Sequence, residues 1–123
     1  MATVLTNTGK ARMIAVLFGD SVTPPTYIAW GTGAGTAAAA DTTLFTEAAE
    51  SRTNGTKAKA TTNVSNDTYR VTGTITATGS KTITNAGLFD ASTSGNLFVK
   101  GDFTGIALNS GDSIAFTIDI VQT

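Results

Sequence analysis

One stretch of the chain, residues 68–78, alternates between two kinds of side chain. Small apolar residues and a glycine take every second position from Val71 to Ala77, and threonines fill the positions between them. Side chains of a β-strand point alternately to its two faces, so this pattern predicts a strand with an apolar inner face and a threonine outer face. The same period of two runs from Ile114 to Ile120. We therefore expect a fold built mainly from strands.

The composition agrees with this expectation. Threonine makes up roughly a fifth of the 123 residues, and there are 13 glycines. Threonine is β-branched and favours the pleated surface of a strand, whereas glycine suits tight turns. Charged residues account for only 14% of the chain, below the usual quarter, so threonine must supply much of the polar surface.

Several function classes are disfavoured by what the sequence contains. The net charge is -1 and the eight basic residues are scattered, which argues against nucleic-acid binding. The chain has no cysteine and no histidine, so it lacks thiol nucleophiles, thiolate metal sites and the commonest general base. We expect no enzyme activity, no cofactor and no bound metal. The apolar run from Met13 to Phe18 is far shorter than the ~20 residues of a membrane span, so no membrane partner is expected.

We expect a single domain over residues 1–123, comprising an N-terminal arm (1–8), a short helix (9–19) and a β-sandwich (26–123). Six to eight short strands separated by turn residues at spacings of about ten predict an antiparallel jelly-roll or β-sandwich. The predicted fold class is thus mostly β, with one short N-terminal helix.

The helix is apolar almost all round. Thr6, Asn7 and Thr8 are suitable N-cap residues, and Gly19 is a suitable C-cap residue. Ala11, Ile14, Ala15 and Phe18 form one apolar stripe, and Met13 and Leu17 lie outside it. A helix of this kind is usually buried on both sides. Two readings follow: the helix plugs an open end of the β core, or a partner covers its second side.

Two strands in the second half of the chain have less regular patterns. Residues 81–89 change phase near Ala86 and Gly87, which predicts a β-bulge there. In residues 96–103, alternation would place Leu97 and Val99 on one face, opposite Phe98 and Lys100. Between residues 37 and 50 we expect a loop with a turn of helix.

Three motifs invite a chemical reading. The segment Gly33–Ala38 matches the G-x-G-x-x-G/A fingerprint, but a dinucleotide site would need a βαβ unit, and antiparallel strands follow instead. Six carboxylates could take part in acid/base chemistry or bind calcium, although a residue such as Asp119 on a polar strand face is more often solvated or paired with a cation. They are Asp41, Glu47, Glu50, Asp102, Asp112 and Asp119. Trp30, Tyr27 and Tyr69 could form a sugar-stacking platform or pack in the core.

The sequence also resembles a family of small tailed-phage virion structural proteins. The resemblance rests on Tyr27 to Gly33 (Y-I-A-x-G-T-G), on Asp41 to Leu44 with Glu50 and Arg52, on Ile83 to Phe89, and on the turn and strand from Gly111 to Val121. Members of this family are described as capsid decoration, cement or tail-fibre-like proteins. The resemblance implies a structural role in the virion, after assembly in the host cytoplasm, and no catalytic residues.

The function we expect is that of a capsid decoration (cement) protein, which stabilises the shell by bridging capsid subunits. One alternative is a tail or tail-fibre component, and a second is a carbohydrate-binding β-sandwich module. The expected partners are the major capsid protein or other virion proteins, together with further copies in a dimer or trimer. The predicted contact residues are Met13, Leu17, Phe18, Trp30, Leu44 and Phe45.

Overall fold

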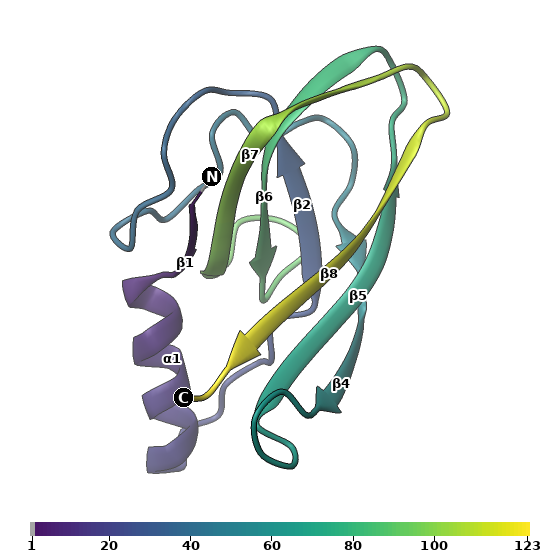
Figure 1. Cartoon of the computed structure of the whole chain (residues 1–123). Helices are drawn as coiled ribbons and strands as arrows, with labels where there is room; N and C mark the ends of the chain where they lie inside the picture. The colour runs from purple at the N-terminus through teal and green to yellow at the C-terminus, as the bar shows by residue number, and fades with distance from the viewer. Residues whose placement is uncertain (1) are drawn as a thin grey trace.

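The structure is a computed structural model that describes residues 2–123, and it confirms the mostly β fold with one short N-terminal helix. Two antiparallel sheets form a β-sandwich, and the helix lies beside one end of it (Figure 1). The elements are β1 (Thr3–Leu5), α1 (Asn7–Phe18), β2 (Tyr27–Gly31), β3 (Thr53–Asn54), β4 (Thr56–Ala60), β5 (Thr68–Thr76), β6 (Lys81–Phe89), β7 (Leu97–Leu108) and β8 (Ser113–Val121).

The larger sheet has the strand order β1-β7-β6-β2-β3, and the smaller sheet has the order β4-β5-β8. The chain passes from the larger to the smaller sheet at Gly55, between β3 and β4. A Cβ at Gly55 would lie 2.6 Å from Val71 Cγ1 and 2.7 Å from the Thr72 carbonyl oxygen. Only glycine therefore lets the backbone come this close to β5 at the crossing point.

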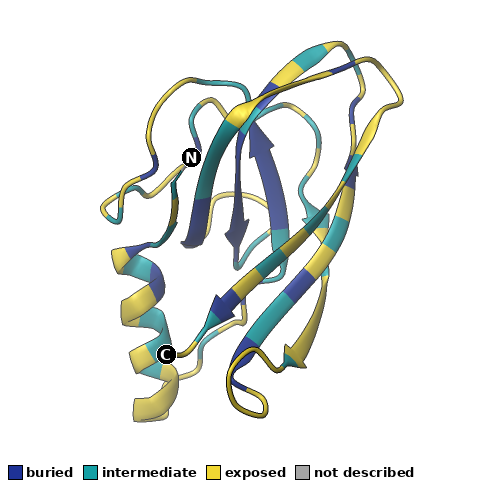
Figure 2. Ribbon diagram, in the orientation of Figure 1, coloured by how far each residue is buried: buried dark blue, intermediate teal, exposed yellow. Residues whose placement is uncertain are grey.

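The larger sheet is covered on both faces (Figure 2). Its inner face packs against the smaller sheet in the main core, where Ile28, Val71 and Leu88 are 0% exposed. A second, smaller apolar cluster lies on the outer face and comprises Ala29, Leu44, Phe89 and Leu97. The segment between β2 and β3, residues 32–52, supplies Leu44 to this cluster. We call this segment the β2–β3 loop.

The smaller sheet follows the alternation expected from the sequence. Val71 and Ile75 of β5 are buried, and the threonines between them are exposed. On β8, Phe116 packs against Trp30 of the larger sheet with ring centroids 6.4 Å apart in an edge-to-face arrangement. The outer face of this sheet is open to solvent, so its polar residues are available for pairing across strands.

Strand β7 departs from regular pairing at two places. Leu88 pairs with Val99 and Phe89 pairs with Leu97, which leaves Phe98 as an extra residue. Because of this bulge, Phe98 and Val99 both join the main core, and Leu97 lies on the other face. The predicted alternation of residues 96–103 is therefore wrong.

The second irregularity in this ladder lies between the pairs Ile83–Ile106 and Asn85–Asp102, where Thr84 of β6 stands opposite three residues of β7. The sequence pattern predicted a bulge near Ala86 and Gly87, slightly further along the strand. Ala86 and Gly87 are regularly paired with Gly101 and Lys100. The change of phase is real, but it occurs at Thr84.

The expected N-terminal arm is partly a strand, because β1 pairs with Gly101, Lys100 and Val99 of β7. Helix α1 then begins two residues earlier than predicted. Thr6 is its N-cap and is 0% exposed: its side chain accepts the Gly9 N–H at 2.9 Å, and its hydroxyl donates to the Leu97 carbonyl at 2.5 Å. Thr6 thus fixes the start of α1 to the bulged part of β7.

The β2–β3 loop contains no helical turn, contrary to the expectation for residues 37–50. It consists of turns, bends and a single bridge from Glu47 to Gly31. Side-chain hydrogen bonds hold the β2–β3 loop on the larger sheet.

Candidate partner-binding surface

The side chain of Asn85 anchors the middle of the β2–β3 loop. Asn85 is 0% exposed. Its Oδ1 accepts the Phe45 backbone N–H at 3.0 Å, and its Nδ2 donates to the Phe45 carbonyl at 3.0 Å. A buried side-chain amide that bonds both the backbone N–H and the carbonyl of one residue replaces the two hydrogen bonds that a neighbouring strand would make. It holds Phe45 against β6.

The glycine-rich segment after β2 makes room for this loop. A Cβ at Gly33 would lie 2.9 Å from the Phe45 carbonyl carbon, and a Cβ at Gly35 would lie 2.6 Å from the Phe45 ring. Gly35 also has a φ of 155°, at the margin of the range that favours glycine. The fingerprint-like glycines therefore accommodate Phe45 in a loop between antiparallel strands, and residues 2–123 form no βαβ unit.

Glu50 ties the end of the loop to Trp30 and to the connection between β5 and β6. One carboxylate oxygen accepts the Trp30 indole N–H at 3.0 Å, and the other is bound by Lys81 and by the Thr78 N–H, the latter at 3.0 Å. Burial alone would raise the pKa of Glu50, but the hydrogen bonds from Lys81, Thr78 and Trp30 outweigh it and hold the pKa well below its ordinary value. Glu50 is thus a structural carboxylate that stays ionised.

Arg52 joins two loops. Its guanidinium makes a bidentate pair with Glu47, with both N···O distances 2.9 Å. It also donates to the carbonyls of Ala91 and Ser94, at 2.9 and 2.7 Å. The guanidinium carbon lies 3.6 Å from the centroid of the Phe89 ring. The Arg52 side chain is only 6% exposed. Most of its N–H donors are hydrogen-bonded within the molecule, and the flat face of its guanidinium stacks on Phe89.

Lys100 of β7 is 1% exposed and fills a similar role. Its Nζ binds Asp41 at 2.9 Å and the Thr43 carbonyl at 2.8 Å, and it lies 3.2 Å from the centroid of the Phe45 ring. A backbone hydrogen bond from Ala38 and the contact with Lys100 lower the pKa of Asp41. The lysine charge is therefore buried but compensated.

None of the six carboxylates proposed for acid/base chemistry or calcium binding stands free. Besides the three described above, Asp102 accepts the Ala37 N–H at 2.7 Å, and Asp112 accepts the Asn109 N–H at 2.8 Å. Asp119 pairs with Arg70 at 2.8 and 2.9 Å, as expected for a residue on the polar face of β8. Among residues 2–123, no three acidic side chains gather as they would around a metal ion. These carboxylates stabilise the fold.

The aromatic residues Trp30, Tyr27 and Tyr69 do not form the sugar-stacking platform that the sequence left open beside core packing. Trp30 is 1% exposed in the main core. Tyr27 packs against the second cluster, on the other face of the sheet. The Tyr69 hydroxyl donates to the Pro25 carbonyl at 2.7 Å. Core packing, the alternative reading of Trp30, is therefore correct, and nothing favours the carbohydrate-binding hypothesis.

The largest exposed apolar side chains of the described residues gather on α1. Ile14 is 62% exposed, Leu17 83% and Phe18 86%. We call these three residues, together with the exposed Ala11, the helix surface. Met13 and the buried Gly9 face the sandwich instead. The stripe recognised in the sequence therefore points mainly to solvent, and the helix does not plug the β core.

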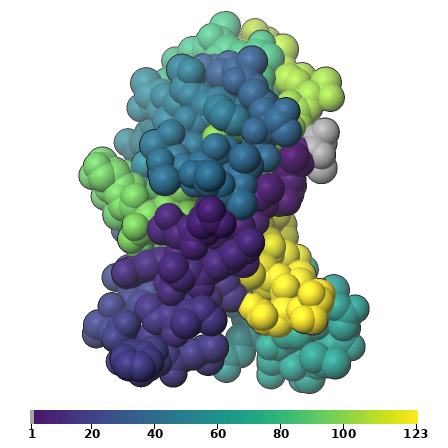
Figure 3. All heavy atoms as spheres, turned by 90° about the vertical axis from the view of Figure 1, so that its left-hand side faces the viewer, coloured from purple at the N-terminus to yellow at the C-terminus, as the bar shows by residue number. Residues whose placement is uncertain are grey.

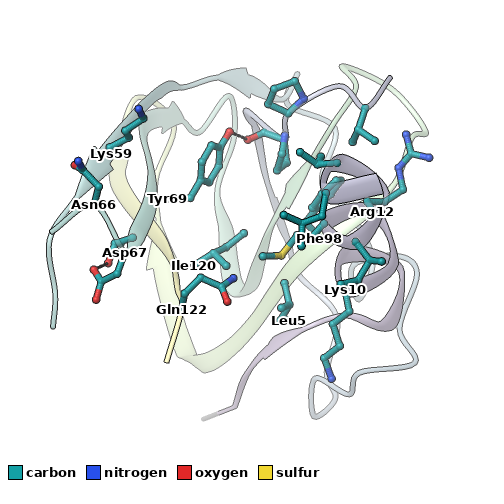
Figure 4. A pocket seen from close by; sticks show the side chains of 18 residues that line it. Leu5, Lys10, Arg12, Lys59, Asn66, Asp67, Tyr69, Phe98, Ile120 and Gln122 are labelled. Carbon is teal, nitrogen blue, oxygen red and sulfur yellow. Dashed lines mark hydrogen bonds between the residues drawn. The ribbon is translucent and has the colours of Figure 1, made fainter. Parts of the chain in front are cut away.

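A groove of about 920 Å³ separates the lower part of α1 from the end of the sandwich (Figure 4). Leu5 and Phe98 line one side of it, and Tyr69 and Ile120 line the other. Met13 of α1 also lines the groove. Near its start α1 is attached to β7 through Thr6, and Met13 packs against the main core. Most side chains after Met13 are exposed, and Val16 is 56% exposed.

The predicted contact residues separate into two groups. Leu17 and Phe18 are on the exposed side of α1, and Met13 lines the groove while packing against the main core. Trp30 and Leu44 are buried at 1% and 6% exposure, and Phe45 lies within the braced loop, so these three do not share a surface with α1. Ile14 was missing from the predicted contacts, although its place in the apolar stripe signalled it.

No helix within residues 2–123 is both long enough and apolar enough to cross a membrane. No curated protein and no solved structure matches the chain. A family model does match, over residues 4–123, and it is described as podophage GP4 fiber I protein gp80. That match covers both sheets, the helix and the β2–β3 loop. The chain therefore belongs to the podophage GP4 fiber I protein gp80 family of phage virion structural proteins.

Proposed function

We propose that this chain is a structural component of the tail-fibre apparatus of a phage virion, and that it acts by non-covalent binding. The observation that carries the proposal is the match to a fiber I protein model over residues 4–123. The match favours the tail-fibre alternative over the capsid cement protein that the sequence analysis put first.

The distribution of polar and apolar residues supports a binding role. Asn85, Arg52, Glu50 and Lys100 all hold the β2–β3 loop on the larger sheet. They make the sandwich a rigid platform. The apolar residues left exposed are concentrated on α1, where Leu17 and Phe18 are the most exposed. Exposed apolar patches of this kind mark protein interaction sites.

The partners we propose are other virion proteins, including further copies of this chain. Met13, Leu17 and Phe18 remain the proposed contacts, with Ile14 added to them. We expect assembly in the host cytoplasm, with the protein then carried in the finished particle.

Immunogold labelling of intact particles tests the location. Antibody against this chain should label the tail, and particles from a phage lacking the gene should be unlabelled. Label spread evenly over the capsid shell would contradict the fibre proposal and support the cement reading. A second measurement uses purified capsids and tails separated after disruption, in which the chain should be recovered with the tail fraction.

A further inference from the structure

A second exposed apolar region, separate from the helix surface, lies between β7 and β8. It is a cleft of about 380 Å³ at the border of the smaller sheet. Ile106 of β7 pairs with Ile83, which is 0% exposed in the main core, yet Ile106 itself is 42% exposed. Cross-strand partners point to the same face, so Ile106 faces the inside of the sandwich but is left uncovered. The cleft is also lined by Val99, Phe103, Phe116 and Ile118.

Strand β8 borders this cleft and has one free edge. Its nine residues pair with β5, and within residues 2–123 no strand pairs with its other side. The Gln122 N–H donates to the Asp67 carbonyl at 2.9 Å, and this bond fixes the phase of the ladder. Even-numbered residues of β8 therefore bond β5, and odd-numbered residues direct their N–H and C=O groups outward. The outward residues are Ser113, Ala115, Thr117, Asp119 and Val121. The C-terminal part of β8, drawn in yellow, reaches the surface beside α1 (Figure 3).

The other edge strands of the two sheets are protected against the addition of a further strand. β1 and β3 have only three and two residues. On β4, Lys57 pairs with the buried Val71, so this lysine faces inward, and Lys59 faces the same way. Inward charges at an edge oppose the burial of another strand. β8 lacks this protection, because its inward residues are apolar and its one charge, on Asp119, is paired with Arg70 across the outer face.

We propose that β8 accepts an extended segment of a different virion protein as a fourth strand of the smaller sheet, and that alternate apolar side chains of this segment fill the cleft. The inference rests on the proposed function, in which the chain acts by binding. The free edge requires an extended backbone, because its donors and acceptors repeat at every second residue. The cleft requires apolar side chains at the same period, since β7 and β8 present apolar side chains to it.

A free segment fits this site better than β8 of another copy does. Phe116 packs edge-to-face on Trp30 of its own chain, with ring centroids 6.4 Å apart, and Ile118 and Ile120 join the same core. These inward side chains stay against their own larger sheet, so pairing of two β8 edges would extend the sheet without filling either cleft. The occupant is therefore a segment whose inward side chains are not already buried in a sandwich of its own.

Amide hydrogen exchange of the full chain, measured in solution and in purified particles, tests the added strand. In solution the amides of Phe116 and Ile118 should exchange slowly, because they bond β5, whereas those of Ala115 and Thr117 should exchange fast. In particles the amides of Ala115 and Thr117 should slow about tenfold or more, because they gain acceptors there. Odd-numbered amides of β8 that exchange equally fast in both states would overturn the proposal.

A proline at an outward position tests the edge. Thr117→Pro removes an N–H that pairs with no strand within residues 2–123, so the domain should still fold, as urea denaturation would show. Its incorporation into particles should fall about tenfold or more. Lys57→Pro is the matched control, because the same alternation directs the Lys57 N–H outward at the protected edge of β4, and it should be incorporated normally. Equal incorporation of the two variants would contradict the proposal.

A charge in the cleft gives a second variant that leaves the backbone of β8 unchanged. Ile106→Asp should lower incorporation into particles about tenfold, because it places a carboxylate where an apolar side chain is expected to bind. Val64→Asp makes a similar change at a residue that is 65% exposed and lies outside the cleft, and it should be incorporated like the wild type. Normal incorporation of Ile106→Asp would count against occupation of the cleft.

Cross-linking identifies the occupant, and the chain has no native cysteine to interfere. Ala115→Cys carrying a short photoactivated cross-linker should link, within particles, to a different virion protein. Thr74→Cys is the control, because Thr74 pairs with Ala115 one strand inside the edge, and it should link much less. Links from residue 115 to another copy of this chain would overturn the proposal. Protected odd-numbered amides in a chain that antibody locates on the capsid would overturn the fibre role and leave the strand site intact.

Discussion

Asn85 and Phe45 are joined by a reciprocal pair of hydrogen bonds, in which the Asn85 side chain accepts the Phe45 N–H and donates to the Phe45 carbonyl. Asn85→Asp should lower the free energy of unfolding by about 2–4 kcal/mol, because it removes the donor and buries a charge. Urea denaturation at pH 7 measures this. Gln122→Glu makes the same chemical change at an exposed residue and should have little effect. Similar losses in both variants would contradict the anchoring role.

Gly35→Ala should destabilise the protein by about 1–3 kcal/mol, because the new methyl group would lie 2.6 Å from the Phe45 ring. Gly79→Ala is the control, since nothing lies within 4 Å of a Cβ there, and it should be neutral or slightly stabilising. Thermal unfolding of both variants makes the comparison. Equal melting temperatures would mean that the glycine-rich segment does not accommodate Phe45 as described.

Arg52→Lys should cost about 2 kcal/mol of stability although the charge is kept, because lysine cannot reproduce the fork that binds Glu47 and two backbone carbonyls. Arg70→Lys is the matched change in the exposed pair with Asp119 and should cost about 0.5 kcal/mol. Chemical denaturation of the two variants gives the difference. A larger loss of stability in Arg70→Lys than in Arg52→Lys would mean that Arg70, and not Arg52, is the arginine that stabilises the fold.

Stability should fall in acid. Hydrogen bonds hold the pKa values of Asp41, Glu50 and Asp119 below their ordinary values, which are 3.8 for Asp and 4.5 for Glu. The folded state then releases protons more readily than the unfolded chain, so its extra stability is complete above about pH 4.5 and is lost as the pH falls below it. With no histidine, the urea midpoint should change little between pH 7 and pH 5. A midpoint that stays constant down to pH 2 would contradict these carboxylate contacts.

The strands were the most predictable part of the fold. In β5 and β8 one face is buried and the other is solvated, so the period of two survives in the sequence and gives the correct faces. The pairing of Asp119 with a cation was foreseeable for the same reason. In β7 the bulge at Phe98 breaks the period, and nothing in the local sequence distinguishes it from a regular strand.

The site was less predictable. The sequence marked Leu17 and Phe18 as apolar residues of an all-round apolar helix, but only the fold decides which side faces solvent. The choice depends on Thr6, which fixes the start of α1 to β7 through contacts 91 and 92 residues apart in sequence. Trp30 was predicted as a contact residue, and the fold places it in the main core at 1% exposure, because an exposed and a buried tryptophan look alike in a sequence. Glu50 and Arg52 belong to a pattern visible in the sequence, but their partners come from distant segments that only the fold brings beside them.

The first and last strands belong to different sheets, β1 to the larger and β8 to the smaller. A pulling force applied between the two ends of the chain would therefore draw the sheets apart, and it would act on the apolar layer between them instead of stretching one continuous ladder. Apolar contacts are not directional, so the layer offers little resistance to separation beyond single bonds such as the one from the Thr53 hydroxyl to the Thr74 carbonyl. A tail fibre under tension would load this subunit more safely through contacts on a single sheet or on α1 than through its termini.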